Sequence, residues 1–291
     1  MSQALCEDCS MSNLFTTVCA MTFQGNASNG LQQDAFFFVD DYYQEVLGIT
    51  PVHRCDGAFC VAVSDGVSQS DFSQVASLTT MKAVKQLWQT YLDNPNQSAV
   101  MDILKIYNKV ATLPKRYYGA SATFALVYRT FAKDNQSNSS VVIKHMGDSR
   151  VYHFSAMTKT WRCITRDHNL LNQLVDEQAA AENRQADFSK YNREGMASPL
   201  YALTDCLIAD SDLDNNPMPA YESQTLAVSS GDCLVVCTDG VYDLVPCCEW
   251  QAIDETTDLQ NWLKQLCKQI YASEGRAYDN ATAILVKFES Q

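Results

Sequence analysis

Short apolar runs bounded by turn residues recur along most of the chain. They are rich in Val, Ile, Phe and Tyr, and some alternate between two faces, as Phe124, Leu126 and Tyr128 do. Runs of this kind are typical of β-strands. The pattern predicts strands over residues 14–23, 35–39, 58–63, 122–131, 141–146, 151–154, 225–228, 233–237 and 281–288.

Three segments have apolar residues at helical spacing instead. We expect a helix over residues 72–92, a second that starts near residue 100 and ends before Pro114, and a third over residues 259–270. Asp258 is the predicted N-cap of the third helix. Because regular helices do not separate the strands, the pattern favours an α+β layered fold over a doubly wound one.

The organisation of the chain is predicted to be simple. No linker or internal repeat divides the 291 residues, so we expect a flexible tail over residues 1–13 and a single domain over residues 14–291. Within this domain, residues 209–223 form an acidic, Pro-containing loop.

Composition excludes several classes of protein. The formal net charge is -13, which argues against nucleic-acid binding and against docking on anionic lipid. We expect no signal peptide and no membrane span, and therefore a cytoplasmic location. The 12 cysteines are expected to be free thiols. Cys6 and Cys9 form a single CxxC, which is either a metal or redox element or an incidental pair in the tail.

Five aspartates lie next to predicted strands. Three of them adjoin a glycine, and the full set is Asp34, Asp65, Asp148, Asp239 and Asp279. If these strand ends meet at one edge of a sheet core, the carboxylates converge and repel one another unless a cation is present.

The chemistry of such a cluster is specific, although each member has a simpler explanation. All-oxygen ligands select hard cations such as Mg²⁺ or Mn²⁺, and two such ions assist phosphoester hydrolysis. An Asp beside a Gly after a strand is also a common turn residue, because its side chain caps local N–H groups. The pattern alone leaves both interpretations open.

A set of motifs resembles, in order along the chain, those of the metal-dependent type-2C Ser/Thr protein phosphatases (PPM family). They are AVSDG (62–66), HMGDSRVY (145–152), TRDHNLLNQLV (165–175), VVCTDGVYDLV (235–245) and DNATAILV (279–286), with QQDAF (32–36) and YGASATF (118–124) as weaker matches. The likeness spans residues 14–288. Residues 64–77 further resemble a bacterial subgroup in which the domain is often linked to a protein kinase.

The resemblance implies a fold and an activity. The fold would be a four-layer α-β-β-α sandwich of two antiparallel sheets flanked by helices, with a variable flap near residues 169–205. The activity would be hydrolysis of phosphoserine and phosphothreonine in proteins by a metal-bridged hydroxide. The implied partners are a phosphorylated protein substrate and a cognate Ser/Thr kinase, and we expect a monomer that binds neither nucleic acid nor membrane.

The resemblance also implies a binuclear Mn²⁺ or Mg²⁺ site. Asp65 would bridge the two ions and the Gly66 carbonyl would bind one of them. Asp239 and Asp279 would complete the ligand set of the other ion. Asp148, together with Asp239, would hold a third, weaker ion.

Other residues are given supporting roles by the resemblance. Asp34 matches the acid that orients water. Thr123 and Arg150 match structural positions, and His168 is expected to hold the base of the flap by hydrogen bonds.

Three departures from the family pattern bear on activity. Asn29 occupies the position of an Arg that binds substrate phosphate in the family. Val67 follows Gly66, where some members carry a His proposed as general acid, so protonation of the leaving group would fall to water. Asp205 stands in the flap motif where an Arg is common.

These departures keep a second function open. The chain could be a weakly active or inactive binding or sensing module that retains the fold and the metals. A carboxylate–metal nuclease is disfavoured by the charge and by the lack of a basic or aromatic groove.

Overall fold

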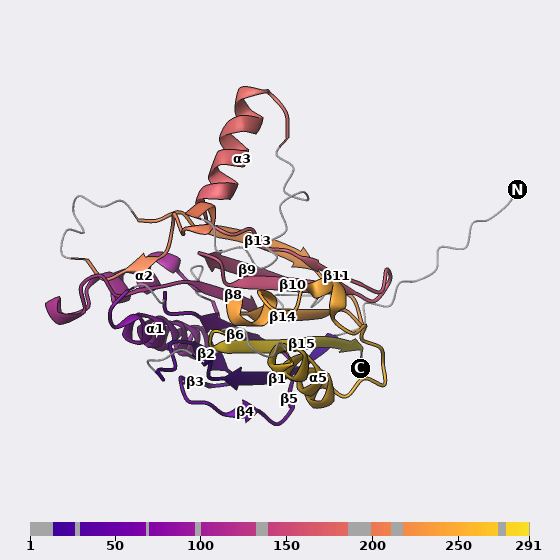
Figure 1. Ribbon diagram of the computed structural model, residues 1–291. Helices are drawn as coiled ribbons and strands as arrows, with labels where there is room; N and C mark the ends of the chain where they lie inside the picture. Colours follow the sequence, from indigo (N-terminus) through magenta and orange to yellow (C-terminus); the bar gives the residue numbers. More distant parts are fainter. Residues whose placement is uncertain are drawn as a thin grey trace, which may run out of the picture.

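Two antiparallel β-sheets pack face to face in the computed structural model of the chain (Figure 1). The structure describes residues 14–26, 30–67, 70–96, 100–131, 139–185, 199–210, 218–272 and 278–290. The predicted tail, residues 1–13, therefore lies outside the described residues, as does the middle of the predicted flap, residues 186–198.

The first sheet has seven strands built around the two longest. Its strands are β11 (Thr160–Cys163), β10 (Arg150–Ser155), β14 (Cys233–Cys237), β15 (Ala281–Ser290), β1 (Leu14–Phe23) and β4 (Gly48–Ile49), with β5 (His53–Cys55) also paired to β1. The β1–β15 ladder runs without interruption from the pair Leu14 and Ser290 to the pair Phe23 and Ala281. This ladder places the start of β15 beside the end of β1.

The second sheet has six strands. Their order is β13 (Glu222–Ala227), β9 (Ser140–Met146), β8 (Phe124–Arg129), β6 (Phe59–Ser64), β2 (Ala35–Phe38) and β3 (Asp41–Tyr43). A small separate sheet pairs β7 (Ser121–Ala122) with β12 (Leu207–Ile208).

The alternation of side chains along the strands creates three hydrophobic layers. In β1, for example, Val18 and Ala20 belong to the cluster between the two sheets, whereas Cys19 and Met21 belong to the cluster on the outer face of the first sheet. A third cluster covers the outer face of the second sheet. Both sheets are thus buried on two faces, which explains why their central strands have almost no polar positions.

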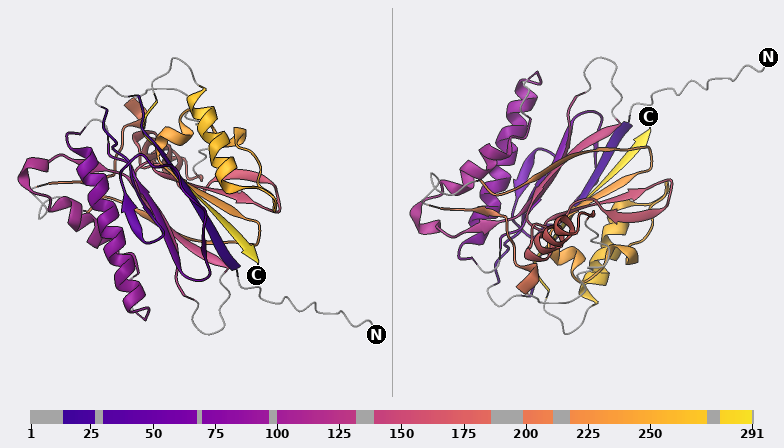
Figure 2. Two further views of the ribbon diagram at one scale, coloured as in Figure 1. Left: turned by 90° about the horizontal axis from the view of Figure 1, so that it is seen from below. Right: turned by 90° about the horizontal axis from the view of Figure 1, so that it is seen from above.

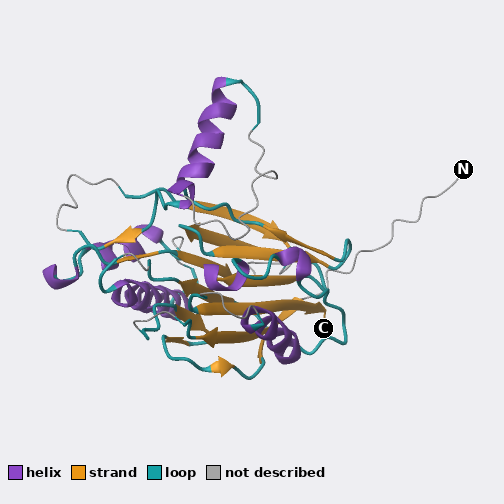
Figure 3. Cartoon of the chain, in the orientation of Figure 1, coloured by secondary structure: helices purple, strands orange, loops and turns teal. Residues whose placement is uncertain are grey.

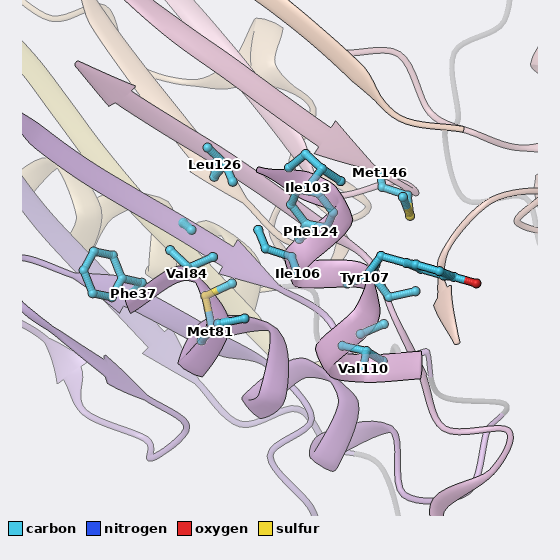
Figure 4. Close-up of a cluster of buried hydrophobic side chains, with 14 of the residues drawn as sticks. Phe37, Met81, Val84, Ile103, Ile106, Tyr107, Val110, Phe124, Leu126 and Met146 are labelled. Carbon is cyan, nitrogen blue, oxygen red and sulfur yellow. The ribbon is translucent and has the colours of Figure 1, made fainter. Parts of the chain in front are cut away.

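Helices cover both outer faces (Figure 2). Helices α1 (Ser73–Asp93) and α2 (Ile103–Ala111) pack on the second sheet through side chains such as Met81, Ile106 and Phe124 (Figure 4). Helix α5 (Leu259–Tyr271) packs on the first sheet, where Trp262 meets Trp161 and Trp250. This arrangement confirms the predicted α-β-β-α sandwich.

The remaining helical segments are short or stand apart. They are α3 (Leu170–Ala181), α4 (Asp239–Tyr242) and the 3₁₀ turns η1 (Lys115–Tyr117), η2 (Pro199–Tyr201) and η3 (Cys247–Glu249). Helix α3 projects away from the sandwich (Figures 1 and 3). Only Val175 and Ala179 of α3 are buried, which agrees with its polar sequence. None of the helices in the described part of the chain has the length and hydrophobicity needed to cross a membrane.

Capping residues fix two helix starts. The Asp258 carboxylate accepts a hydrogen bond from the Asn261 amide at 2.7 Å, so the predicted N-cap of α5 is confirmed. The second helix starts at Ile103 rather than near residue 100, because Asp102 caps it by accepting a hydrogen bond from the Leu104 amide at 3.0 Å.

The short strands were not predicted from the sequence. Strands β3, β4, β5, β7, β11 and β12 contain only two to four residues each, too few to show an alternating pattern. Strand β13 begins at Glu222, inside the predicted acidic loop, because an edge strand with one solvent-facing side tolerates polar residues.

Two residues of α2 provide a test of the packing. Ile106 is fully buried against the second sheet, whereas Leu104 is 49% exposed. We expect Ile106→Ala to lower the free energy of unfolding by about 2–5 kcal/mol, because it leaves a cavity. The control Leu104→Ala should change it by about 0.5 kcal/mol or less. Urea denaturation followed by circular dichroism measures both, and equal effects would contradict this packing.

Candidate metal centre

The five predicted aspartates lie at the same end of the sandwich, and the strand register explains why. In the second sheet, Ala35 pairs with Ser64 in antiparallel β2 and β6, so Asp34 and Asp65 sit side by side just beyond that pair. In the first sheet, Cys237 pairs with Ala283, which brings the start of α4 to the start of β15. Asp239 opens α4 and Asp279 precedes β15 by two residues.

A buried hydrogen bond connects the two sheets at this end. The Thr238 hydroxyl, which follows β14, donates to Oδ2 of the buried Asp34 at 2.8 Å. The same hydroxyl accepts a hydrogen bond from the Thr282 amide at 3.1 Å, and the Thr238 amide donates to the Thr282 carbonyl at 3.0 Å. Thr238 is therefore locked by backbone contacts and fixes the orientation of the Asp34 carboxylate.

The carboxyl group of Asp65 is the electrostatic centre of the cluster. It experiences the negative charge of four other acids, Asp239, Asp34, Asp148 and Asp279. Burial, reinforced by this repulsion, raises the pKa of Asp65 well above its usual range. Burial likewise raises the pKa of Asp34 to about 7, although nearby Thr hydroxyls act in the opposite direction. The metal-free cluster is thus destabilised whenever its acids are ionised.

Two glycines allow the chain to come close together around these acids. A Cβ atom on Gly66 would lie 2.8 Å from the backbone of Ser73, and one on Gly240 would lie 2.1 Å from the Asn280 carbonyl oxygen. Real Cβ atoms do not approach other atoms so closely, so each position accepts only glycine without movement of the backbone. The glycine beside Asp65 and the glycine beside Asp239 therefore serve packing of the site.

The turn that carries Asp148 is held from both sides. Gly147 has a φ of +90°, in the region that favours glycine, and Thr123 fills the space next to it. The Gly147 amide donates to Nδ1 of His168 at 2.9 Å, and the His168 amide donates back to the Gly147 carbonyl at 2.9 Å. As predicted, His168 makes hydrogen bonds at the base of the flap region, and these reach the turn before Asp148.

Arg150 is a structural residue, as predicted. Its guanidinium makes two hydrogen bonds to the Asp167 carboxylate, at 2.8 and 2.7 Å, and lies 3.7 Å from the centre of the Tyr242 ring. The Tyr242 hydroxyl in turn donates to the Asp148 carbonyl at 2.8 Å. Arg150 therefore supports the Asp148 turn indirectly, and it is committed to Asp167 rather than available for a substrate phosphate.

The donor set fits a hard divalent cation. Every side chain in the cluster offers carboxylate oxygens, and Oδ1 of Asp34 is buried with no hydrogen-bond partner among the described residues. No three His, Cys, Asp or Glu side chains in the described ranges already have the geometry to hold an ion. Mg²⁺ sites in proteins take one or two carboxylates and complete their shell with water, so these side chains are ligands of a suitable kind.

Sequence reasoning missed three residues that support the cluster. They are Thr238, Asp167 and Tyr242, all inside motifs that carried the family resemblance. Their sequence positions offered no signal for these contacts, because each contact joins segments distant along the chain. Asn29 lies outside the described residues, so the structure adds nothing to its assignment.

Comparison with known proteins agrees with the motifs found in the sequence. The family model for protein phosphatase 2C matches residues 27–281. The chain belongs to the protein phosphatase 2C family. All five aspartates fall within the matched region.

Individual relatives of this phosphatase 2C chain are distant. A provisionally named protein phosphatase of Mycoplasma genitalium is 28% identical over 174 residues, which are 59% of this chain and 60% of that protein. The chain thus spans about three fifths of the length of this curated relative.

Solved structures share the fold. The S. agalactiae serine/threonine phosphatase superposes with a TM-score of 0.64 at 18% identity, covering 94% of this chain and 99% of that one. The catalytic domain of the phosphatase PstP, solved with two manganese ions, gives a TM-score of 0.58 at 16% identity, covering 96% and 100%.

The repulsion within the cluster generates a test. Asp65→Asn removes the ionisable group at the centre of the five acids. We therefore expect the melting temperature of the metal-free phosphatase 2C chain to rise at neutral pH. Each kcal/mol of relieved repulsion should raise the melting temperature by about 2–4 °C. The same variant should lose the rise in melting temperature that Mn²⁺ gives the wild-type chain.

Asp40→Asn is the matched control, because it removes an equal charge from an exposed position. It should change neither the metal-free melting temperature nor the Mn²⁺ effect. A destabilised Asp65→Asn protein, or one that keeps the full Mn²⁺ effect, would contradict this account of the cluster.

Proposed function

We propose that this protein is a metal-dependent phosphatase that hydrolyses phosphoserine and phosphothreonine in proteins. The observation that carries the proposal is the convergence of four carboxylates on that of Asp65 at one end of a protein phosphatase 2C fold. Such a cluster has a large electrostatic cost that divalent cations offset.

The proposed metal ligands are those expected from the motifs. Asp65 would bridge two ions, and the Gly66 carbonyl would bind one of them. Asp239 and Asp279 would hold the other, and Asp148 with Asp239 would hold a third. The tight backbone packing at Gly66 and Gly240 supports these assignments, because it holds the turns that carry Asp65 and Asp239 against neighbouring segments.

Divalent ions, either Mn²⁺ or Mg²⁺, would supply Lewis-acid activation of water and neutralisation of charge on the phosphoryl group. The protein would supply orientation. Oδ2 of Asp34 accepts from the Thr238 hydroxyl, which leaves Oδ1 as the atom that would orient the attacking water. Val67 has no proton to give, so the leaving alkoxide would take its proton from water.

The proposal extends to the setting of the enzyme. We infer a phosphorylated protein as substrate, a cognate Ser/Thr kinase as the source of that substrate, and a monomeric enzyme. Every cysteine in the described ranges is a free thiol, which supports a reducing compartment such as the cytoplasm.

Removing one ligand tests the activity. We expect Asp239→Ala to lower Mn²⁺-dependent hydrolysis of p-nitrophenyl phosphate and of a phosphothreonine peptide by about 100-fold or more, because a metal contributes several kcal/mol to transition-state stabilisation. Released phosphate measures both, in Mn²⁺ and in Mg²⁺. If the metal-saturated wild-type chain hydrolyses neither substrate faster than the variant, the enzymatic proposal fails.

A second candidate function is a binding or sensing module with little turnover. The observation that favours it is Asn29, at the position where the family carries a phosphate-binding Arg. Bidentate Arg–phosphate contacts are strong and directional, so their loss weakens substrate anchoring.

Restoring the Arg separates the two candidates. If the protein is a phosphatase with weak phosphate anchoring, Asn29→Arg should raise kcat/KM for p-nitrophenyl phosphate by about 10-fold, as expected for one charged hydrogen-bonded contact. Asn29→Lys is the control for charge without bidentate geometry and should gain less. Turnover near background in all three proteins, with metal still bound, would favour the binding module.

A further inference from the structure

An aromatic pair, one ring exposed and the other partly buried, lies beside the glycine turn of the candidate metal centre. The rings of Phe72 and Tyr117 meet edge to face, with centroids 5.4 Å apart, and Phe72 is 47% exposed. The guanidinium of Arg116 lies 4.7 Å from the centre of the Tyr117 ring. These three side chains form a continuous surface, which we call the aromatic–arginine platform.

Backbone contacts place the platform next to the cluster of acids. Phe72 directly precedes Ser73, whose backbone lies against Gly66 and whose hydroxyl accepts a hydrogen bond from Gln33, the neighbour of Asp34. Tyr117 leads into the segment that pairs with Gly66 through Ala122. The platform therefore borders the turn that contains Asp65 and Gly66.

Local structure does not explain why Phe is found at position 72. Its backbone is left-handed, with φ 61° and ψ 24°, a conformation that is unfavourable for a bulky residue. It occupies the N-cap of α1, yet its side chain makes no capping hydrogen bond. An Asn would suit both the backbone and the cap better. A strained residue with a half-exposed ring is therefore a candidate for a contact with another molecule.

The segment that carries Arg116 and Tyr117 differs in charge from the rest of the chain. Residues 103–119 contain four Lys and Arg residues and no Asp or Glu, in a chain with a net charge of -13. Arg116 is exposed, and no ion pair joins it to another residue in the described part of the structure. The platform thus combines an apolar ring with an uncompensated positive charge at the edge of the site.

We propose that the aromatic–arginine platform selects phosphopeptides that carry an aromatic side chain and an acidic side chain beside the phosphorylated residue. The aromatic side chain would pack on Phe72 and Tyr117, and the carboxylate would pair with Arg116. This proposal names a substrate class for the phosphatase activity proposed above and rests on it.

Four phosphothreonine peptides test the proposal. The four peptides share one sequence and differ at two positions on one side of the phosphothreonine. One position is Phe or Ala, and the other is Glu or Gln. A second set of four peptides has these two positions on the other side of the phosphothreonine. For each protein, the measured quantity is the ratio of kcat/KM between two peptides. This ratio does not depend on the fraction of protein molecules that are active, which can differ between variants. In the preferred set, wild type should favour Phe over Ala by about fivefold and Glu over Gln by about threefold.

The variants separate the two contacts. Phe72→Asn should abolish the preference for Phe and keep the preference for Glu, whereas Phe72→Tyr should keep both. Arg116→Gln should abolish only the preference for Glu. Because Asn tolerates the left-handed backbone, the melting temperature of Phe72→Asn should not fall; a role in folding alone would lower it and leave both ratios unchanged.

Matched controls come from elements that do not form the platform. Phe131, also 47% exposed and stacked on Tyr91, lies beyond the far end of β8, and Arg162 is an exposed arginine on the edge strand β11. Phe131→Asn and Arg162→Gln should leave both ratios as in wild type. Ratios near one in wild type, or ratios unaffected by Phe72→Asn and Arg116→Gln, would overturn the proposal.

The test distinguishes failure of the platform from failure of the enzyme. If wild type with Mn²⁺ hydrolyses none of the peptides, the proposed phosphatase activity fails. In that case the peptides are labelled with a fluorophore and their dissociation constants are measured by anisotropy. The ratio of dissociation constants between two peptides then replaces the ratio of kcat/KM. Equal constants for all peptides would overturn the platform as well.

Discussion

Mutual repulsion among clustered carboxylates is the constraint on which this structure depends. Strand register alone brings Asp34 beside Asp65 and the start of α4 beside the start of β15, so the fold forces like charges together. Without compensation, these charges oppose folding. The surrounding contacts therefore have to hold the carboxylates against a force that pushes them apart.

Hydrogen bonds and close packing are among the contacts that resist this force. Thr238, next to the first sheet, donates a hydrogen bond to Asp34, next to the second sheet. The Arg150–Asp167 pair supports the Asp148 turn through Tyr242. Arg150 is thus engaged by Asp167. Burial and mutual repulsion raise the pKa values of Asp34 and Asp65, and bound divalent cations would offset that cost.

The sequence was informative wherever a pattern was repeated. Long strands and helices were predicted because their apolar residues recur at fixed spacing, and the central ladder and the helical layers follow from them. Strands such as β4 and β7, with two residues each, have no internal pattern and depend on their partners. The convergence of the five aspartates was anticipated through the motifs, but Thr238 and Tyr242 were not, because their partners are remote in sequence. Phe72 was read as the start of a helix, and its left-handed backbone appears only in three dimensions.

The β1–β15 ladder has a consequence for the order of assembly. Residues 279–290 supply both Asp279 and β15, the strand that pairs with β1 on one side and with β14 on the other. During synthesis, the facing edges of β1 and β14 stay unpaired until these residues have left the ribosome. Pairing of β15 with β1 spans more than 250 positions and is slow to form, so the newly made chain depends on residues 279–290 both to close the sheet and to complete the acid cluster.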